Sequence, residues 1–158
     1  MELLESLRKD LLRMLNMLSI LQRQRLYDVA YSFIGADASP DDVAPDELGC
    51  ADSLSQVIDA AFPELRFPTI VSTRELLDYL TRSPSFQEID SPQKGDIIMS
   101  ATGTGKPGFI GHCGIVGKAW IMSNDSRTGT WEANYTLDGW KRYYEGRGGI
   151  PTKYFRVV

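Results

Sequence analysis

The apolar pattern of this chain changes character at Ser91–Pro92. Before that point, leucines and other apolar residues recur every three or four positions, which is the period of an amphipathic helix. After it, short runs rich in β-branched and aromatic residues alternate with glycine-rich turns, which is typical of strands. Helices followed by strands favour an α+β domain. At 158 residues the chain is long enough for one domain with its own core.

The N-terminal segment is predicted to be helical from residue 1 to about residue 34, with Gly35 as the stop signal. Its apolar face runs through Leu3, Leu4, Leu7, Leu11, Leu15, Leu18 and Leu21, and continues to Leu26, Val29, Ala30 and Phe33. Because 34 residues are long for one globular helix, we expect a division near Arg23–Arg25. Such a division would separate an amphipathic helix at 1–25 from a domain at 26–158. We expect the apolar face to pack on that domain, with a partner helix in an oligomer as the alternative.

Further elements follow from local patterns. An acidic, proline-containing loop is expected at 36–49. It leads into a helix from Cys50 or Ala51 to about Phe62. A second helix is expected at 73–81, with Thr73 and Glu75 in its first turn. The predicted strands are 95–99, 112–120, 121–123, 130–136 and 154–158. The strands at 121–123 and 130–136 flank a turn at 124–129, so they are expected to form a hairpin.

Charge and composition exclude several classes of protein. The formal net charge is −4, whereas a nucleic-acid-binding protein usually has a basic excess. Two cysteines and one histidine are too few for a disulfide scaffold or for two structural zinc sites, and no cofactor is implied. Neither a secretory signal peptide nor a membrane span is recognisable. We therefore expect synthesis in the cytoplasm without a signal peptide.

Cys50 stands at the predicted start of a helix, directly after Gly49. Unpaired N–H groups and the partial positive charge of a helix N-terminus favour a thiolate over a thiol. The first N–H groups of the helix also provide a place for a developing oxyanion. We therefore select Cys50 as a candidate nucleophile, and Ala51 and Asp52 as candidate substrate-binding residues.

His112, the only histidine, opens a predicted strand after Gly111. A cysteine on a helix and a histidine on a facing strand form a nucleophile and its general base. A third residue should orient the imidazole. Glu132 and Asn134 lie two apart on the hairpin strand and therefore share a face, and Glu132 is placed first. Asn124 and Asp125 are rivals, but their position predicts a role in the turn.

The neighbouring Cys113 is expected to face the core, because successive side chains of a strand point to opposite faces. The same alternation argues against a metal site made of Cys50, His112 and Cys113. By the same alternation, Trp131 and Tyr135 are expected to point to the face opposite Glu132 and Asn134, and Trp131 is expected to be buried. Trp140 is a candidate for stacking on sugar or peptide, with packing as the alternative.

Several segments together resemble the CHAP and NlpC/P60 group of cysteine peptidases and amidases. The segments, in order, are LYDVAYSFIG (26–35), GCADSLSQVI (49–58), PQKGDIIM (92–99), IGHCGIVG (110–117) and TWEANYT (130–136). The fold implied is papain-like α+β, with N-terminal helices packed on a small antiparallel sheet. The pattern is more similar to CHAP than to NlpC/P60, which usually has a second histidine as its third member.

This resemblance implies hydrolysis of an amide bond in bacterial peptidoglycan, either between sugar and stem peptide or within the peptides. Cys50 would be the nucleophile, His112 the base and then the acid, and Glu132 or Asn134 the orienting residue. The acidic segment before Cys50 is similar to forms found in phage and prophage lysis proteins. A lysin delivered to the cell wall by a holin or by the virion needs no signal peptide.

Three alternatives stay open at this point. One is a wall-binding or virion structural module with the same fold and no reactive thiol. Another is a metal-dependent hydrolase using Cys50, His112 and Glu132. A transglutaminase-like or deamidating toxin domain would share the cysteine mechanism.

Overall fold

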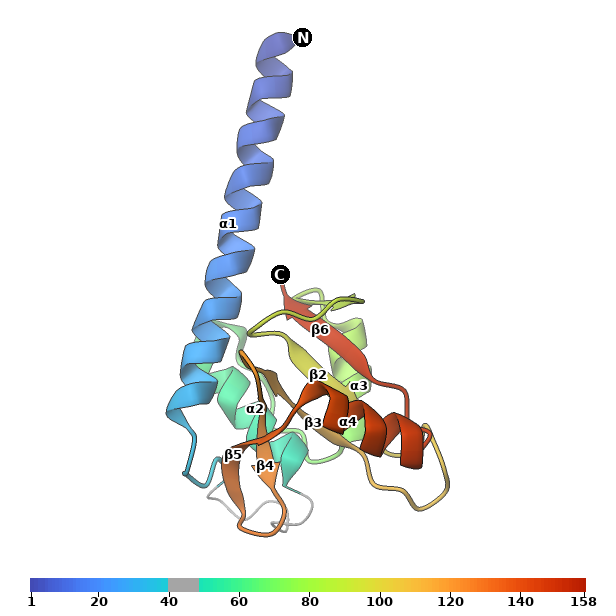
Figure 1. The fold of residues 1–158 in the computed structure, drawn as a ribbon. Helices are drawn as coiled ribbons and strands as arrows, with labels where there is room; N and C mark the ends of the chain where they lie inside the picture. Colours follow the sequence, from blue (N-terminus) through green and yellow to red (C-terminus); the bar gives the residue numbers. More distant parts are fainter. Residues whose placement is uncertain (40–48) are drawn as a thin grey trace.

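Helices α1, α2 and α3 precede the sheet in the computed structural model, which describes residues 1–39 and 49–158 (Figure 1). The helical elements are α1 (Glu2–Ser32), α2 (Cys50–Ala61), η2 (Pro63–Leu65), α3 (Thr73–Arg82), α4 (Leu137–Trp140) and η3 (Lys141–Arg147). The strands are β1 (Phe86–Ile89), β2 (Ile97–Ser100), β3 (His112–Val116), β4 (Ile121–Asp125), β5 (Thr130–Tyr135) and β6 (Lys153–Val157). The predicted α+β class is confirmed.

The strands form one antiparallel sheet in the order β1-β6-β2-β3-β4-β5. The predicted hairpin is confirmed as β4 and β5, while the strand predicted at 112–120 ends earlier, at Val116. Sequence analysis missed β1, which has only four residues, and the helical segment formed by α4 and η3. Helix α3 begins at Thr73 as predicted and runs one residue further, to Arg82; its N-cap is Ser72, whose hydroxyl accepts a hydrogen bond from the Glu75 N–H.

Alternate residues of the strands pack into two separate cores. In β2, Ile97 and Met99 belong to the larger core with α2, whereas Ile98 packs with Trp140 and Tyr144 on the opposite face. The sheet therefore lies between α2 on one side and the α4–η3 segment on the other (Figure 1). Both faces of the sheet are covered, and the ends of its strands remain available for a site.

The turn before β2 is held by a buried ion pair. Gly95 has φ +90°, and a Cβ there would collide with the backbone carbonyl of Arg23 in α1. The next residue, Asp96, is fully buried and accepts two hydrogen bonds from Arg156 of β6, at 2.9 and 2.7 Å. Asp96 also accepts from the Gln93 N–H at 2.7 Å. The Gly-Asp pair thus fixes α1, β2 and β6 relative to one another.

Helix α1 corrects two of our predictions. It is a single helix of 31 residues, with no division near Arg23–Arg25, because residues 2–32 contain no proline or glycine that would interrupt it. Arg25 instead reaches Glu64 at 3.2 Å and lies over the Phe62 ring. Only Leu26 and Ala30 of α1 are buried, so the face that includes Leu3 to Leu21 does not pack on the domain as expected. The domain boundary at residue 25 stays a prediction. Within the described residues, no helix combines the length and apolar character needed to cross a bilayer.

Candidate active site

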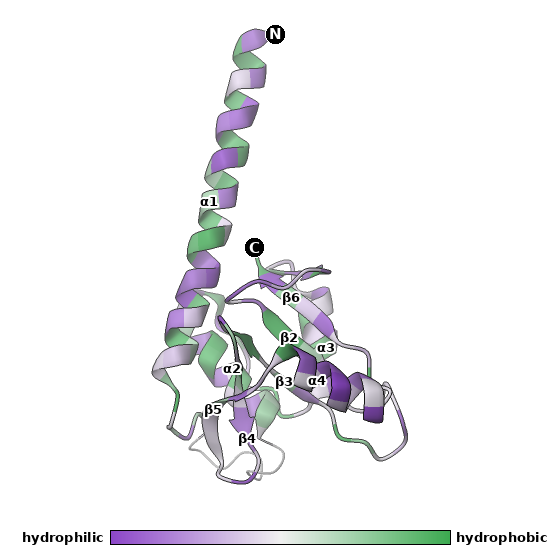
Figure 2. Cartoon of the chain, in the orientation of Figure 1, coloured by the Kyte–Doolittle hydropathy of each residue, from purple (hydrophilic) through white to green (hydrophobic). Residues whose placement is uncertain are grey.

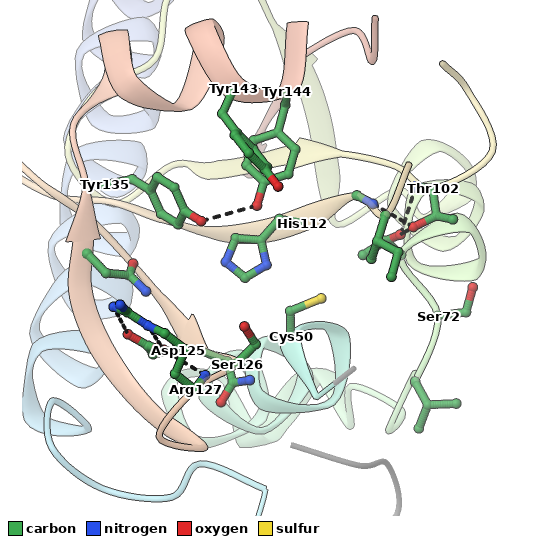
Figure 3. Close-up of a pocket in the computed structure, with 16 residues that line it drawn as sticks. Cys50, Ser72, Thr102, His112, Asp125, Ser126, Arg127, Tyr135, Tyr143 and Tyr144 are labelled. Atoms are coloured by element: carbon green, nitrogen blue, oxygen red, sulfur yellow. Dashed lines mark hydrogen bonds and ion pairs between the residues drawn. The ribbon is translucent and has the colours of Figure 1, made fainter. Parts of the chain in front are cut away.

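A cleft of about 800 Å³ lies where α2 begins, beside the ends of β3, β4 and β5 (Figure 3). Its walls come from five parts of the chain: the start of α2, the segment before α3, the β2–β3 loop, the β4–β5 hairpin and η3. Cys50 and His112 both line this cleft, and Figure 3 shows the imidazole directly beside the cysteine side chain. The structure therefore brings the predicted nucleophile and base together.

Cys50 is half-buried at the first position of α2. Among residues 1–39 and 49–158 no side chain caps this helix, and the Ser53 N–H donates to the Gly49 carbonyl at 2.8 Å. The pKa of the Cys50 thiol is lowered well below its ordinary value, chiefly by a hydrogen bond from Cys113. Burial opposes this effect, while His112 and the Ala51 N–H add to it. Cys50 thus has the electrostatic environment of a reactive thiolate.

The His112 ring is held by aromatic neighbours and is only 8% exposed. It stacks against Trp140, with ring centroids 5.3 Å apart, and against Tyr144, at 5.9 Å. The Trp140 indole is itself fixed, because its N–H donates to the Ser100 hydroxyl at 3.0 Å. These contacts confine the imidazole to one orientation beside Cys50.

Ser123 connects His112 to Asn134. The Nε2 atom of His112 lies 2.8 Å from the Ser123 Oγ, and that hydroxyl donates to the Asn134 Oδ1 at 2.6 Å. Since the Ser123 proton is directed to Asn134, its oxygen accepts from the His112 Nε2–H. The other ring nitrogen, Nδ1, then carries the lone pair, as a base acting on Cys50 requires. Ser123 was not among the residues predicted from sequence.

A β-bulge explains how Asn134 reaches this position. Ile121 pairs with Tyr135 and Met122 with Ala133, so Asn134 has no partner of its own in β4. An extra residue of this kind redirects neighbouring side chains. Both Asn134 and Tyr135 consequently line the cleft, although strict alternation predicted opposite faces for them.

The structure reverses our order of preference for the third residue. Glu132 does not line the cleft, and its carboxylate accepts a hydrogen bond from the Thr130 hydroxyl at 2.9 Å. Asp125 serves the hairpin turn as predicted, since it accepts from the Arg127 N–H at 2.8 Å. Asn124 is 3% exposed and lines the cleft, which its assignment to the turn did not anticipate.

Cys113 is fully buried in the core on the α2 side of the sheet, as its position in the strand predicted. Helix α2 packs on the same face, so the thiol of Cys113 meets Cys50. Burial raises the pKa of Cys113 well above its ordinary value, and the neighbouring Cys50 raises it further. Cys113 therefore stays protonated and acts as a hydrogen-bond donor to Cys50, a contact that alternation alone did not reveal.

Three predicted substrate-binding side chains are not available to a substrate. Trp140 is fully buried, Ala51 is fully buried, and Asp52 is 1% exposed and accepts from the Gln56 amide at 3.2 Å. The indole of Trp140 supports the imidazole instead. The exposed aromatic ring of the cleft is Tyr143, at 40% exposure.

A chain of hydrogen bonds holds the loop before His112. The Thr102 hydroxyl accepts from the Thr73 hydroxyl at 3.1 Å and from the Gly111 N–H at 2.8 Å. A Cβ at Gly111 would collide with the carbonyl of Ser100, so only glycine permits this approach of the loop to β2. The start of α3 is thereby tied to the residue that precedes the imidazole.

Among residues 1–39 and 49–158, no three His, Cys, Asp or Glu side chains are grouped as metal ligands would be. The metal site considered from sequence needs Glu132, whose side chain is not in the cleft.

Comparison with solved structures gives a match to a chain of the Tae3–Tai3 complex from Ralstonia pickettii, a native type VI effector–immunity complex. The match has a TM-score of 0.51 at 22% sequence identity, and covers 84% of this chain and 96% of the other. No family model matches the sequence, and no curated protein matches it significantly. The fold is α+β and papain-like, with helices packed on an antiparallel sheet.

Proposed function

We propose that this protein hydrolyses an amide bond of bacterial peptidoglycan by a cysteine mechanism. Cys50 is the nucleophile, His112 is the general base and then the general acid, and Ser123 with Asn134 orients the imidazole. The observation that carries the proposal is the half-buried Cys50 at a helix start, with a lowered pKa and with His112 beside it in one cleft.

The reaction runs through an acyl-enzyme. The Cys50 thiolate attacks the amide carbonyl carbon, and the tetrahedral oxyanion forms next to the N–H groups that open α2. His112, protonated at Nδ1 by the thiol proton, gives that proton to the leaving amine as the C–N bond breaks. A water molecule then loses a proton to His112 and attacks the thioester. Breaking of the C–S bond releases a carboxylic acid and restores the thiol.

Two arguments favour peptidoglycan as the substrate. The ordered segments of the sequence resemble CHAP and NlpC/P60 enzymes, which act on the bacterial cell wall. The chain also shares its fold with the Tae3 effector, and peptidoglycan is the substrate class that this neighbour suggests. An open cleft of about 800 Å³ with an exposed tyrosine is suited to a peptide or glycopeptide.

The test is digestion of purified cell walls, one type with diaminopimelate and one with lysine in the stem peptide. Mass spectrometry of the released fragments identifies the bond, because endopeptidase and amidase products differ in their new ends. Wild-type protein should release fragments, and Cys50→Ala should release none while keeping the wild-type circular dichroism spectrum. Undiminished cleavage by Cys50→Ala would overturn the proposal.

Thiol labelling separates this enzyme from a wall-binding module of the same fold. Iodoacetamide near neutral pH should modify Cys50 much faster than Cys113, because only the first thiol is both partly exposed and of lowered pKa. A module without catalysis would bind walls and show two slowly reacting thiols. Chelators should leave wall digestion unchanged.

Delivery to the wall is a separate part of the proposal. Similarity to phage lysis proteins favours a lysin that is made without a signal peptide and delivered by a holin or by the virion. Similarity to an effector that is bound by an immunity protein suggests an antibacterial role with a protein inhibitor. Expression in bacteria with and without a cognate holin tests the first setting. The second setting, an antibacterial protein with a protein inhibitor, is tested by co-expression with the product of a neighbouring gene, which should block the cleft and rescue bacterial growth.

A further inference from the structure

The first two-thirds of α1 projects away from the rest of the protein, with the N-terminus at its far tip (Figure 1). Apolar residues along this part of the helix are open to solvent, and Figure 2 shows green turns alternating with purple ones over its whole length. Most helical stability in proteins comes from packing of an apolar face rather than from helix propensity. This segment therefore needs a partner that covers it.

Six of the exposed apolar residues follow a strict heptad, and Leu3, Leu12, Leu15, Met17 and Ile20 are exposed beside them. The a and d positions are Leu4, Leu7, Leu11, Met14, Leu18 and Leu21, and each side chain is between 54% and 71% exposed. An unbroken 3-4 spacing of leucine and methionine is the pattern of a left-handed coiled coil. We call these positions the α1 seam.

The seam ends where α1 meets its own domain. The next a and d positions are Arg25 and Asp28, which are polar, and the buried residues of α1 become Leu26 and Ala30. At about 100° per residue, Leu26 and Ala30 lie roughly a quarter turn or more around the helix from the seam. A second helix can therefore lie along the seam without displacing the contacts between α1 and the domain.

Charge argues against a lipid surface as the partner. Before Arg23, α1 carries three acidic and three basic residues, which are Glu2, Glu5, Asp10, Arg8, Lys9 and Arg13, for a net charge of 3 − 3 = 0. Helices that bind anionic membranes are rich in lysine and arginine on their polar face. Here the charges pair along the helix instead, with Arg8 3.8 Å from Glu5 and Arg13 3.6 Å from Asp10.

We infer that the α1 seam associates with the α1 seam of a second copy of this chain, forming a coiled coil that carries the papain-like domains. An apolar seam without a polar a or d residue is complementary to itself, so two identical helices can pair along it without burying a polar group, and most soluble oligomers are made of identical chains. Covering about three heptads of leucine and methionine removes an area approaching the roughly 800 Å² per partner of a standard interface. The inference does not depend on the proposed enzymatic function.

Sedimentation equilibrium of the full chain tests this association. The wild-type protein should have at least twice the monomer mass of 17.7 kDa. Leu11→Glu combined with Leu18→Glu should weaken self-association by more than about 100-fold, because two charges would enter an apolar seam. The matched control, Ser6→Glu combined with Asn16→Glu, adds the same charge on the opposite side of α1 and should associate like the wild type.

Each other outcome overturns the inference. A wild-type chain that stays monomeric at every concentration has no self-associating seam. A Leu11→Glu, Leu18→Glu variant that associates like the wild type places the contact elsewhere. Cosedimentation of a monomeric wild type with phosphatidylcholine–phosphatidylglycerol vesicles assigns α1 to a membrane instead.

The control for folding is thermal unfolding of the domain. Equal unfolding in both double variants shows that the substitutions act through the seam.

Discussion

The Ser123 Oγ lies 2.8 Å from the His112 Nε2 and donates its own proton to Asn134, 2.6 Å away. A fully buried hydroxyl thus stands between the imidazole and the amide oxygen. This arrangement fixes the tautomer of His112 without a carboxylate. In the proposed reaction Ser123 is a positioning residue, because it would act only through the imidazole.

Replacement of Ser123 by alanine should lower kcat by on the order of 10–100-fold with little change in KM, the size of effect known for partners that orient metal-binding histidines. The His112 Nε2–H would lose its acceptor, and the ring would no longer be held in one tautomer. Initial rates on soluble wall fragments measure the effect. Glu132→Gln is the matched control, and a loss as large as that of Ser123→Ala would restore Glu132 as the orienting residue.

Stability should depend strongly on Asp96. Its buried carboxylate accepts two hydrogen bonds from Arg156, so Asp96→Asn leaves a guanidinium without its counter-charge, at a cost of about 3 kcal/mol or more. Urea unfolding at constant m-value measures the loss. Glu88→Gln breaks the exposed ion pair with Lys153 and should cost less than about 1 kcal/mol. Equal losses in the two variants would contradict this account.

Local sequence signals were sufficient for part of the site. The glycine before Cys50 and the strand that begins at His112 can each be recognised from a few neighbouring residues in the sequence. The structure places the side chains of Cys50 and His112 in one cleft. Ser123 gives no such signal, because a serine in a strand is unremarkable until its neighbours across the sheet are known. Its role depends on the pairing of β3, β4 and β5, which is a tertiary property.

The bulge between β4 and β5 accounts for the errors on β5. Alternation correctly predicted the burial of Trp131, which lies before the irregularity. Beyond the bulge, Asn134 and Tyr135 both line the cleft, whereas regular alternation along a strand places neighbouring residues on opposite faces. In α1, similarly, periodicity identified an apolar face, but it did not show that most of this face lies away from the domain, where only Leu26 and Ala30 are buried.

Tyr143 should contribute to substrate binding. It is the cleft aromatic with a substantially exposed ring, supported from behind by Phe109 at 5.2 Å and Tyr144 at 4.9 Å. Tyr143→Ala should raise KM by up to about 10-fold and leave kcat nearly unchanged, as expected for one lost stacking contact. Trp120→Ala removes an exposed ring that does not line the cleft, so it should change neither constant. A loss confined to kcat would assign Tyr143 to the support of His112 instead.

The pH dependence of Cys50 should change when Cys113 is replaced. The hydrogen bond from Cys113 is the largest cause of the lowered pKa of Cys50, so Cys113→Ala should raise that pKa. The thiolate is the reactive form, and a higher pKa reduces its fraction at any given pH. The rate of iodoacetamide labelling of Cys50, plotted against pH, should therefore rise at a higher pH than in the wild type. Cys113→Ser keeps a donor of similar size and should shift the curve less. Superimposable curves for Cys113→Ala and wild type would show that His112 and the start of α2 stabilise the thiolate without help from Cys113.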